Sequence, residues 1–366
     1  MPDEERRRSS TANEFVTLDE IDHHTAALKN VSFLLESARG AVCVSGSDAA
    51  FLEPSVLVDG HRLDLHGATW TLAGHWVPEM TLERPEGTLR CQYLAPPARR
   101  GFAVRLQFTA RAGAGVQLAL EVNWGKTHQV SDSFHAVEGV RRAGIHPGPP
   151  ATAYLGFRAL WPLFGFGLHA RDAEWKVFSG GVPLSASRTE LEASRNEALV
   201  CRAARFAALQ AGESLDLVLF VGLGLEAYGG IAGAEDLAQH GWDHLYRSTL
   251  SWLTERTVSC RGAAGGHARR LNLNALYNYF FSTGVTLDSE RMVVTSSRSP
   301  RYDLTASYTD RDACLLSFPG LLMIDPAQAR RVLEYSLGVQ VRNVGSFRRY
   351  LDGIPLEPGL ALDAVA

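Results

Sequence analysis

The densest group of residues that could act on a substrate is Tyr308, Asp310, Arg311 and Asp312, directly ahead of the apolar run 313–324. A carboxylic acid can protonate a glycosidic oxygen, arginine forks can hold hydroxyl groups, and an aromatic ring can stack on a sugar face. Asp310 and Asp312 would share a face in an extended backbone but would diverge by about 200° at a helix start. We therefore expect only one of the two aspartates to be catalytic.

The same group allows a structural alternative. Asp310 or Asp312 could cap the helix that follows, and nearby arginines could pair with the aspartates for stability alone. Arg298 and Arg301, a few residues upstream, are predicted to bind substrate together with Arg311 and Tyr308. Spacing by itself leaves both interpretations open.

A second polar cluster lies in the segment 346–366. Four of its residues surround a DG turn and could add substrate contacts from a loop that returns to the site: Arg349, Tyr350, Asp352 and Glu357. The alternative is a solvated turn in which the DG pair serves only as turn chemistry.

Strands are expected over residues 40–225, where Gly, Pro and Asp separate short β-branched or aromatic runs. Several runs, such as 102–111 and 116–124, alternate apolar with polar residues, which predicts antiparallel sheets with one covered face and hence a large sandwich. The segment 185–209 combines helix-favouring composition with a place between strands, so both structures stay open. The glycine-rich stretch 222–230 is interpreted as the exit from the sandwich.

Helices are expected in the second half. Residues 234–257 carry apolar side chains at helical intervals and predict one long connector helix, with Gly241 as its weak point. A second helix is predicted over 267–285. Asp325, as N-cap, and Pro326, at the first helical position, predict a third.

These elements predict a multi-domain protein, β first and then α, as a length of 366 residues also suggests. The predicted parts are a polar N-terminal tail (1–12), a β-sandwich domain (13–233), a linker helix with a Gly-rich break (234–266), and a helical part (267–366).

Composition excludes several classes of function. A net charge of −4 offers no field for a polyanion, so nucleic acid is not an expected partner. No apolar run is long enough for a membrane span. The five cysteines are scattered and lack zinc or disulfide spacing, which predicts no metal site and a reducing compartment. No cofactor is expected, and the absence of a signal-peptide pattern or membrane span predicts a cytoplasmic location.

The stretch YTDRDACLLSFPGLLMIDPAQARRVLEYSLGVQVRN (308–343) resembles the six-hairpin glycosidase superfamily, which includes glycogen-debranching enzymes, glucoamylases, trehalases and processing α-glucosidases. The specific part of the resemblance covers 295–363. It implies that the helical part opens an (α/α)6 barrel behind the sandwich. It also implies that Asp312 is the catalytic acid, with Asp310 as the competing assignment, and that Arg311 binds substrate. Thr309 stands where an aromatic residue is common.

Length sets this chain apart from the family. A complete barrel needs twelve helices and roughly 300 residues, whereas about 100 residues follow Gly266. We therefore expect an incomplete, truncated barrel, without the later helix that carries the general base; a second polypeptide could complete it. The resemblance implies a metal-independent glycoside hydrolase acting on α-linked glucosides or related oligosaccharides or polysaccharides. The alternative is a truncated, non-catalytic carbohydrate-binding relative.

Overall fold

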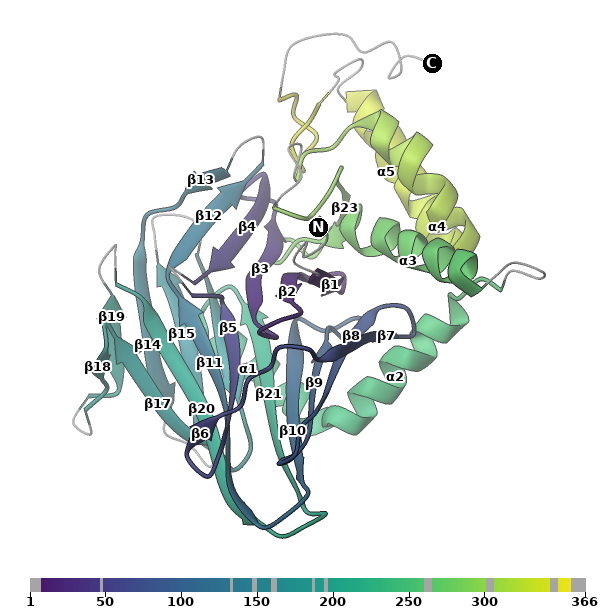
Figure 1. Cartoon of the computed structure of the whole chain (residues 1–366). Helices are drawn as coiled ribbons and strands as arrows, with labels where there is room; N and C mark the ends of the chain where they lie inside the picture. The colour runs from purple at the N-terminus through teal and green to yellow at the C-terminus, as the bar shows by residue number, and fades with distance from the viewer. Residues whose placement is uncertain are drawn as a thin grey trace, which may run out of the picture.

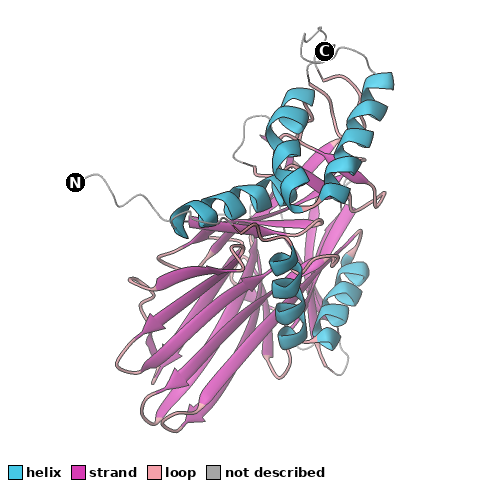
Figure 2. Ribbon diagram, turned by 90° about the vertical axis from the view of Figure 1, so that its right-hand side faces the viewer, coloured by secondary structure: helices cyan, strands magenta, loops and turns pink. Residues whose placement is uncertain are grey.

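The computed structural model describes residues 8–356 apart from 47–48, 132–133, 147–149, 159–162, 186–187, 194–196, 260–264, 301–305 and 343–347. Two large antiparallel sheets lie face to face, and the C-terminal helices stand at one end of them (Figure 1). Two further helices run along the outside of the sandwich (Figure 2).

The first sheet has twelve strands within the described residues: β1 (Arg8–Ala12), β2 (Val16–Asp22), β3 (Leu28–Leu35), β4 (Gly40–Ser45), β5 (Leu52–Val58), β6 (His61–Arg62), β11 (Ala114–Trp124), β12 (Lys126–Val130), β13 (Phe134–Ala136), β17 (Glu174–Ser179), β18 (Val182–Pro183) and β20 (Leu199–Leu209). Its main order is β13-β12-β4-β3-β5-β11-β20-β17-β18. Strand β2 pairs with β3 and with β1, and β6 pairs with β5.

The second sheet has nine strands within the described residues: β7 (Thr69–Ala73), β8 (Val77–Glu83), β9 (Gly87–Leu94), β10 (Gly101–Ala110), β14 (Val140–His146), β15 (Thr152–Arg158), β16 (Leu163–His169), β19 (Glu190–Ala193) and β21 (Ser214–Gly224). Its order is β19-β14-β15-β16-β21-β10-β9-β8-β7. The ambiguous segment 185–209 contributes β19 and β20, because pairing with neighbouring strands overrides its helical composition.

The main hydrophobic core lies between the two sheets. Strand β5 shows the pattern that builds it, since its residues alternate strictly between buried and half-buried. Trp124 lies in this core and stacks on Phe157 and Phe164. The predicted antiparallel sandwich is therefore confirmed.

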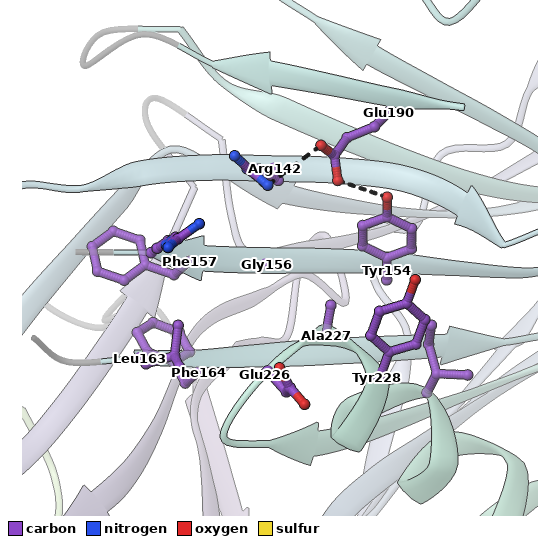
Figure 3. A pocket seen from close by; sticks show the side chains of 12 residues that line it. Arg142, Tyr154, Gly156, Phe157, Leu163, Phe164, Glu190, Glu226, Ala227 and Tyr228 are labelled. Atoms are coloured by element: carbon purple, nitrogen blue, oxygen red, sulfur yellow. Dashed lines mark hydrogen bonds and ion pairs between the residues drawn. The ribbon is translucent and has the colours of Figure 1, made fainter. Parts of the chain in front are cut away.

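The predicted single connector helix is two helices, α1 (Ala227–His240) and α2 (Trp242–Glu255). Gly241 separates them with a φ of +74°, a left-handed conformation that ends α1. Helix α1 lies close against the outer face of the second sheet, and Figure 3 shows its start, at Ala227 and Tyr228, beside β15 and β16. The close approach depends on glycine, because a Cβ on Gly222 would lie 2.2 Å from the Ala234 nitrogen.

The C-terminal part consists of α3 (Gly265–Phe281), the short strands β22 (Thr283–Val285) and β23 (Met292–Val294), a π-helix η1 (Asp312–Ser317), α4 (Phe318–Ile324) and α5 (Pro326–Arg342). Helix α3 ends before the predicted 285, since the last residues of the predicted helix pair with β23. The predicted cap is confirmed: Asp325 Oδ1 accepts a hydrogen bond of 3.0 Å from the Gln328 N–H.

The helical part is attached to the first strands of the chain. Residues 8–12 of the predicted polar tail form β1, and the Trp76 indole N–H donates to the Ala12 carbonyl at 2.8 Å. The Trp76 ring in turn stacks on Phe280 of α3. A second hydrophobic cluster thus runs from the outer face of the second sheet into the helices.

Gly222→Ala tests the seating of α1. Its added methyl group would meet the α1 backbone, so we expect the free energy of unfolding to fall by about 1–3 kcal/mol, as for other overpacked sites. Gly115→Ala is the matched control, because its nearest neighbours would lie at 3.5 Å or more. Urea unfolding measures both variants, and equal effects would contradict this account of the α1 contact.

Candidate functional site

The predicted site residues around Asp310 form one buried hydrogen-bonded network. The Asp310 carboxylate accepts bonds from the Tyr308 hydroxyl, from Gln340 Nε2 at 2.6 Å and from Arg349 Nη1 at 2.7 Å. Arg349 is completely buried, and its backbone pairs with that of Tyr308. Burial, with Asp310 adjacent, raises the pKa of the Tyr308 hydroxyl above its usual value. The structure therefore joins the two clusters of the sequence, at 308–312 and 348–356.

Asp312 has different surroundings. Its N–H donates to Thr309 Oγ1 at 3.3 Å, so a threonine, and neither aspartate, provides the side-chain cap. Asp312 is the first residue of the π-helix. Its side chain is buried, with Oδ1 3.5 Å from Arg311 Nε. Its Oδ2 has no hydrogen-bond partner within the part of the chain that the structure describes. π-Helical turns and unpaired buried oxygens both occur often at functional sites.

The predicted substrate-binding arginines Arg311 and Arg298 differ in burial and in their partners. The Arg311 side chain is about half exposed, beside Asp312. Arg298 is 1% exposed, and its Nη1 donates to three main-chain carbonyls, those of Asn13 at 2.6 Å, Phe280 at 2.9 Å and Thr283 at 3.4 Å. Burial lowers the pKa of the Arg298 guanidinium. These contacts join the helices to the sandwich, and a substrate contact by Arg298 stays an untested prediction.

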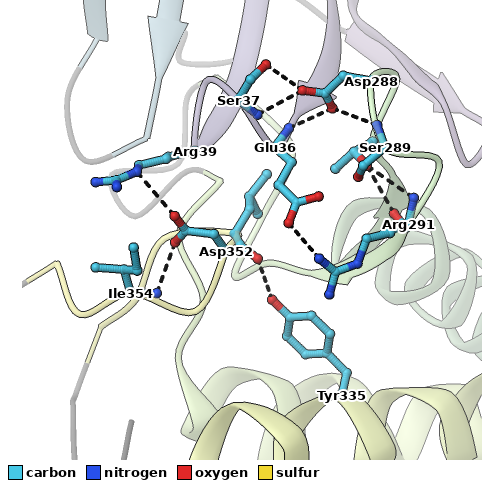
Figure 4. Close-up of polar contacts among 11 residues, drawn as sticks. Glu36, Ser37, Arg39, Asp288, Ser289, Arg291, Tyr335, Asp352 and Ile354 are labelled. Atoms are coloured by element: carbon cyan, nitrogen blue, oxygen red, sulfur yellow. Dashed lines mark hydrogen bonds and ion pairs between the residues drawn. The ribbon is translucent and has the colours of Figure 1, made fainter. Parts of the chain in front are cut away.

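The loop 348–356 docks on the turn between β3 and β4 (Figure 4). Asp352 Oδ2 lies 3.2 Å from Arg39 Nε, and the Arg39 guanidinium lies 5.4 Å from the centre of the Tyr350 ring. Gly353 has a φ of +82°, as the DG turn requires. Tyr350 and Asp352 thus face the sandwich in this structure, while Arg301 and Glu357 lie outside the described residues.

Asp288 makes a second contact with the same turn (Figure 4). Its carboxylate accepts bonds from the N–H groups of Glu36 at 2.9 Å and Ser37 at 2.8 Å, and from the Ser37 hydroxyl. These bonds outweigh the opposing effect of burial and lower the pKa of Asp288. Sequence inspection gave no signal for this contact, because its partners are about 250 residues apart.

Sequence inspection also missed a pocket on the outer face of the second sheet. It has a volume of about 520 Å³ and lies beside the start of α1; its polar and aromatic lining includes Arg142, Tyr154, Arg158, Glu190, Glu226 and Tyr228. Glu226 and Tyr228 lie in the glycine-rich exit 222–230, and Glu190 lies in the ambiguous segment 185–209, but neither segment was predicted to form a site. We call this hollow the sandwich pocket.

Two other findings concern metals and membranes. Among the described residues, no three His, Cys, Asp or Glu side chains gather as a metal site. No described helix has the length and apolar character needed to cross a membrane.

No protein-family model and no curated protein matches this chain. Solved structures do match. A protein from the human microbiome assigned as a kojibiose phosphorylase has a TM-score of 0.55 at 9% identity, over 91% of this chain and 46% of that one. A bacterial glucoamylase complexed with acarbose has a TM-score of 0.58 at 10% identity, over 96% of this chain and 52% of that one. The chain thus has a glycosidase-related fold and spans about half the length of these structures.

The Asp288 contact predicts a defined pH dependence. Its pKa in the folded protein lies below the ordinary 3.8, so its stabilisation is complete above that value and is lost as the pH falls through the folded-state pKa. We expect Asp288→Asn to lose stability at neutral pH and to show a smaller further loss in acid than the unaltered protein.

The control is Asp243→Asn, whose side chain is 84% exposed. Urea midpoints at neutral pH and below the Asp288 pKa measure the effect. If Asp288→Asn and Asp243→Asn show the same acid dependence, the contact does not contribute to stability.

Proposed function

We propose that this protein is a glycoside hydrolase acting on α-linked glucosides or related oligosaccharides, by metal-independent general acid/base hydrolysis. The observation that carries the proposal is the fold shared with the bacterial glucoamylase over nearly the whole of this chain. Since a fold hosts several chemistries, the reaction itself rests on analogy and on the chemistry of the residues near Asp312.

In this proposal Asp312 is the general acid. Its carboxyl group donates a proton to the glycosidic oxygen of the leaving group, while a second carboxylate activates the attacking water on the opposite face of the sugar. Arg311, beside Asp312 and half exposed, binds substrate hydroxyl groups. Asp310 is the weaker assignment, because Tyr308, Gln340 and Arg349 already use its carboxylate.

The general base belongs to a later helix of the barrel. We propose that further helices complete the barrel against the C-terminal part of this chain. The supporting observation is a set of exposed apolar side chains on η1, α4 and α5: Leu315, Leu316, Leu322, Met323, Leu337 and Val341. Exposed apolar groups gathered on one part of a surface commonly mark an interface.

A non-catalytic carbohydrate-binding protein is the second candidate. The ion pair between Asp310 and the buried Arg349 favours it, because the carboxylate of one of the two candidate acids already has a structural partner. The cytoplasmic location expected from the sequence belongs to the proposal as well. The described cysteines, including the buried Cys43, Cys91 and Cys201, form no disulfide.

Asp312→Asn tests the hydrolase. We expect the chain, once further helices complete the barrel and add the general base, to hydrolyse aryl α-glucosides or small α-glucans. In that barrel we expect Asp312→Asn to lose at least about 100-fold in rate, since an amide cannot donate the proton. The control is Glu334→Gln on α5, whose side chain is 58% exposed. Aryl β-glycosides and added phosphate complete the panel, because phosphate dependence would indicate a phosphorylase.

Asp310→Asn separates the two aspartates. It removes one partner of a buried ion pair, so we expect a loss of stability of about 3–5 kcal/mol, visible by urea unfolding, where Asp312→Asn leaves the ion pair intact. A folded chain without turnover on any substrate in the completed barrel would favour the carbohydrate-binding alternative. Full activity of Asp312→Asn would exclude Asp312 as the acid.

The uncovered helical surface makes a separate prediction. In the isolated chain, we expect concentration-dependent self-association that Leu337→Gln with Val341→Gln reduces, because these side chains are 66% and 82% exposed on α5. Phe206→Gln on β20, 72% exposed, is the control. Sedimentation velocity measures the effect; a monomer at all concentrations, or equal effects of both changes, would contradict the proposed interface.

A further inference from the structure

The sandwich pocket exists because of how α1 is seated. The helix lies over β16 and β21, whose outward positions there are glycines: Gly165, Gly167, Gly222 and Gly224. It covers these strands and leaves the neighbouring outer face of β14 and β15 bare beside its first turn (Figure 3). The pocket volume of about 520 Å³ lies within the roughly 300–1,000 Å³ typical of small-ligand sites.

The floor of the pocket is a row of cross-strand neighbours on three strands. Arg142 on β14 lies opposite Gly156 on β15, and Gly156 lies opposite Gly165 on β16. A Cβ on Gly156 would meet only the Cβ atoms of Ala227 at 3.7 Å and Arg142 at 3.9 Å. The missing side chain at Gly156 therefore leaves space above the sheet, between the arginine and the helix.

One wall of the pocket is held in place by polar contacts. Glu190 accepts a hydrogen bond of 2.8 Å from the Tyr154 hydroxyl and lies 3.7 Å from Arg142 Nη1 (Figure 3). Arg142 Nη2 reaches Glu192 at 3.1 Å, while the buried Arg142 Nε has no acceptor within the described residues. The wall is thus preorganised and keeps one donor unused.

The opposite wall combines two exposed side chains with apolar surface and one carboxylate. The Tyr228 side chain is 68% exposed, and Leu163 is 46% exposed. Glu226, at the N-cap of α1, makes no side-chain cap bond, so its carboxylate is not used by the helix. Two exposed apolar side chains beside fixed polar groups suit a ligand with one apolar and one hydroxylated side.

The charges of the lining residues balance. Arg142 and Arg158 are matched by Glu190 and Glu226, so the pocket offers separate donors and acceptors without a net field. The two arginines would attract a strongly anionic ligand, but the two glutamates would repel it. A strongly cationic ligand would meet the reverse. An uncharged, polyhydroxylated ligand fits this lining better.

We propose that the sandwich pocket binds a neutral saccharide of one or two rings, with Tyr228 stacking on a sugar face and Arg142 and Glu190 holding its hydroxyl groups. This second site lies on the sandwich, apart from Asp312 in the helical part. The class of ligand rests on the proposed carbohydrate function, whereas the geometry of the pocket is independent of that proposal.

Calorimetric titration of the full chain with maltose and with cellobiose tests the proposal. The chain used should carry Asp312→Asn, which prevents turnover and lies outside the pocket. We expect binding of at least one disaccharide, weakened at least about tenfold by Tyr228→Ala through loss of the stacking contact. Gly156→Leu should also block binding by filling the open space. Phe206→Ala, an exposed aromatic residue on the first sheet, is the matched control.

The outcomes separate this proposal from the proposed hydrolase. Binding that depends on Tyr228 and Gly156 supports the pocket even if the chain hydrolyses nothing. Hydrolysis that depends on Asp312, with no disaccharide bound or with binding unchanged in both pocket variants, overturns the pocket and leaves the hydrolase standing. Tighter binding of a uronic-acid disaccharide than of its neutral counterpart would overturn the preference for a neutral ligand.

Discussion

The arrangement of the whole molecule depends on one buried cation, the guanidinium of Arg298. A charged group removed from water is costly unless it is hydrogen-bonded, and here Nη1 donates to three main-chain carbonyls, at Asn13, Phe280 and Thr283. Its Nε and Nη2 have no partner among the described residues. The first carbonyl belongs to the start of the sandwich and the other two to the end of α3 and the residues after it. The bonds can form together only when the helices sit on the first strands, as backbone bonds from Val285 to Glu14 and from Leu287 to Leu34 also require.

A second buried guanidinium, that of Arg349, gives the two aspartates of the proposed site different surroundings. Arg349 is fully buried, and unlike Arg298 it has a counter-charge, since Asp310 lies 2.7 Å away. Thr309 caps the turn, so no aspartate is needed there. Asp312 alone of the DRD triplet keeps a carboxylate oxygen without a partner among the described residues. The two aspartates thus differ in their partners, which is why the proposal assigns the acid to Asp312 and not to Asp310.

Local patterns predicted the elements that local physics controls. Alternation gave the strands of the sandwich, and the Asp325–Pro326 pair gave the start of α5, since both signals lie within a few residues. The break at Gly241 was underestimated because composition shows a weak point but does not show a positive φ. The role of Arg298 could not be predicted, as its partner Asn13 lies 285 residues away in sequence. The segment 185–209 became strand for the same reason: its pairing partners, not its composition, decide.

The glycines of β16 and β21 under α1 affect both candidate sites, the one at Asp312 and the sandwich pocket. They let the helix backbone approach the second sheet closely enough to bury its inner side, and that position directs the chain toward α2 and the helical part. The same seating makes the helix begin over β16, so the outer face of β14 and part of β15 stay open and Tyr228 lies at the edge of the opening. A side chain at Gly222 or Gly224 would push α1 away from the sheet. That shift would move the chain that leads to the helical part, where Asp312 lies, and would change the shape of the sandwich pocket. The spacing of one helix from one sheet therefore constrains both candidate sites.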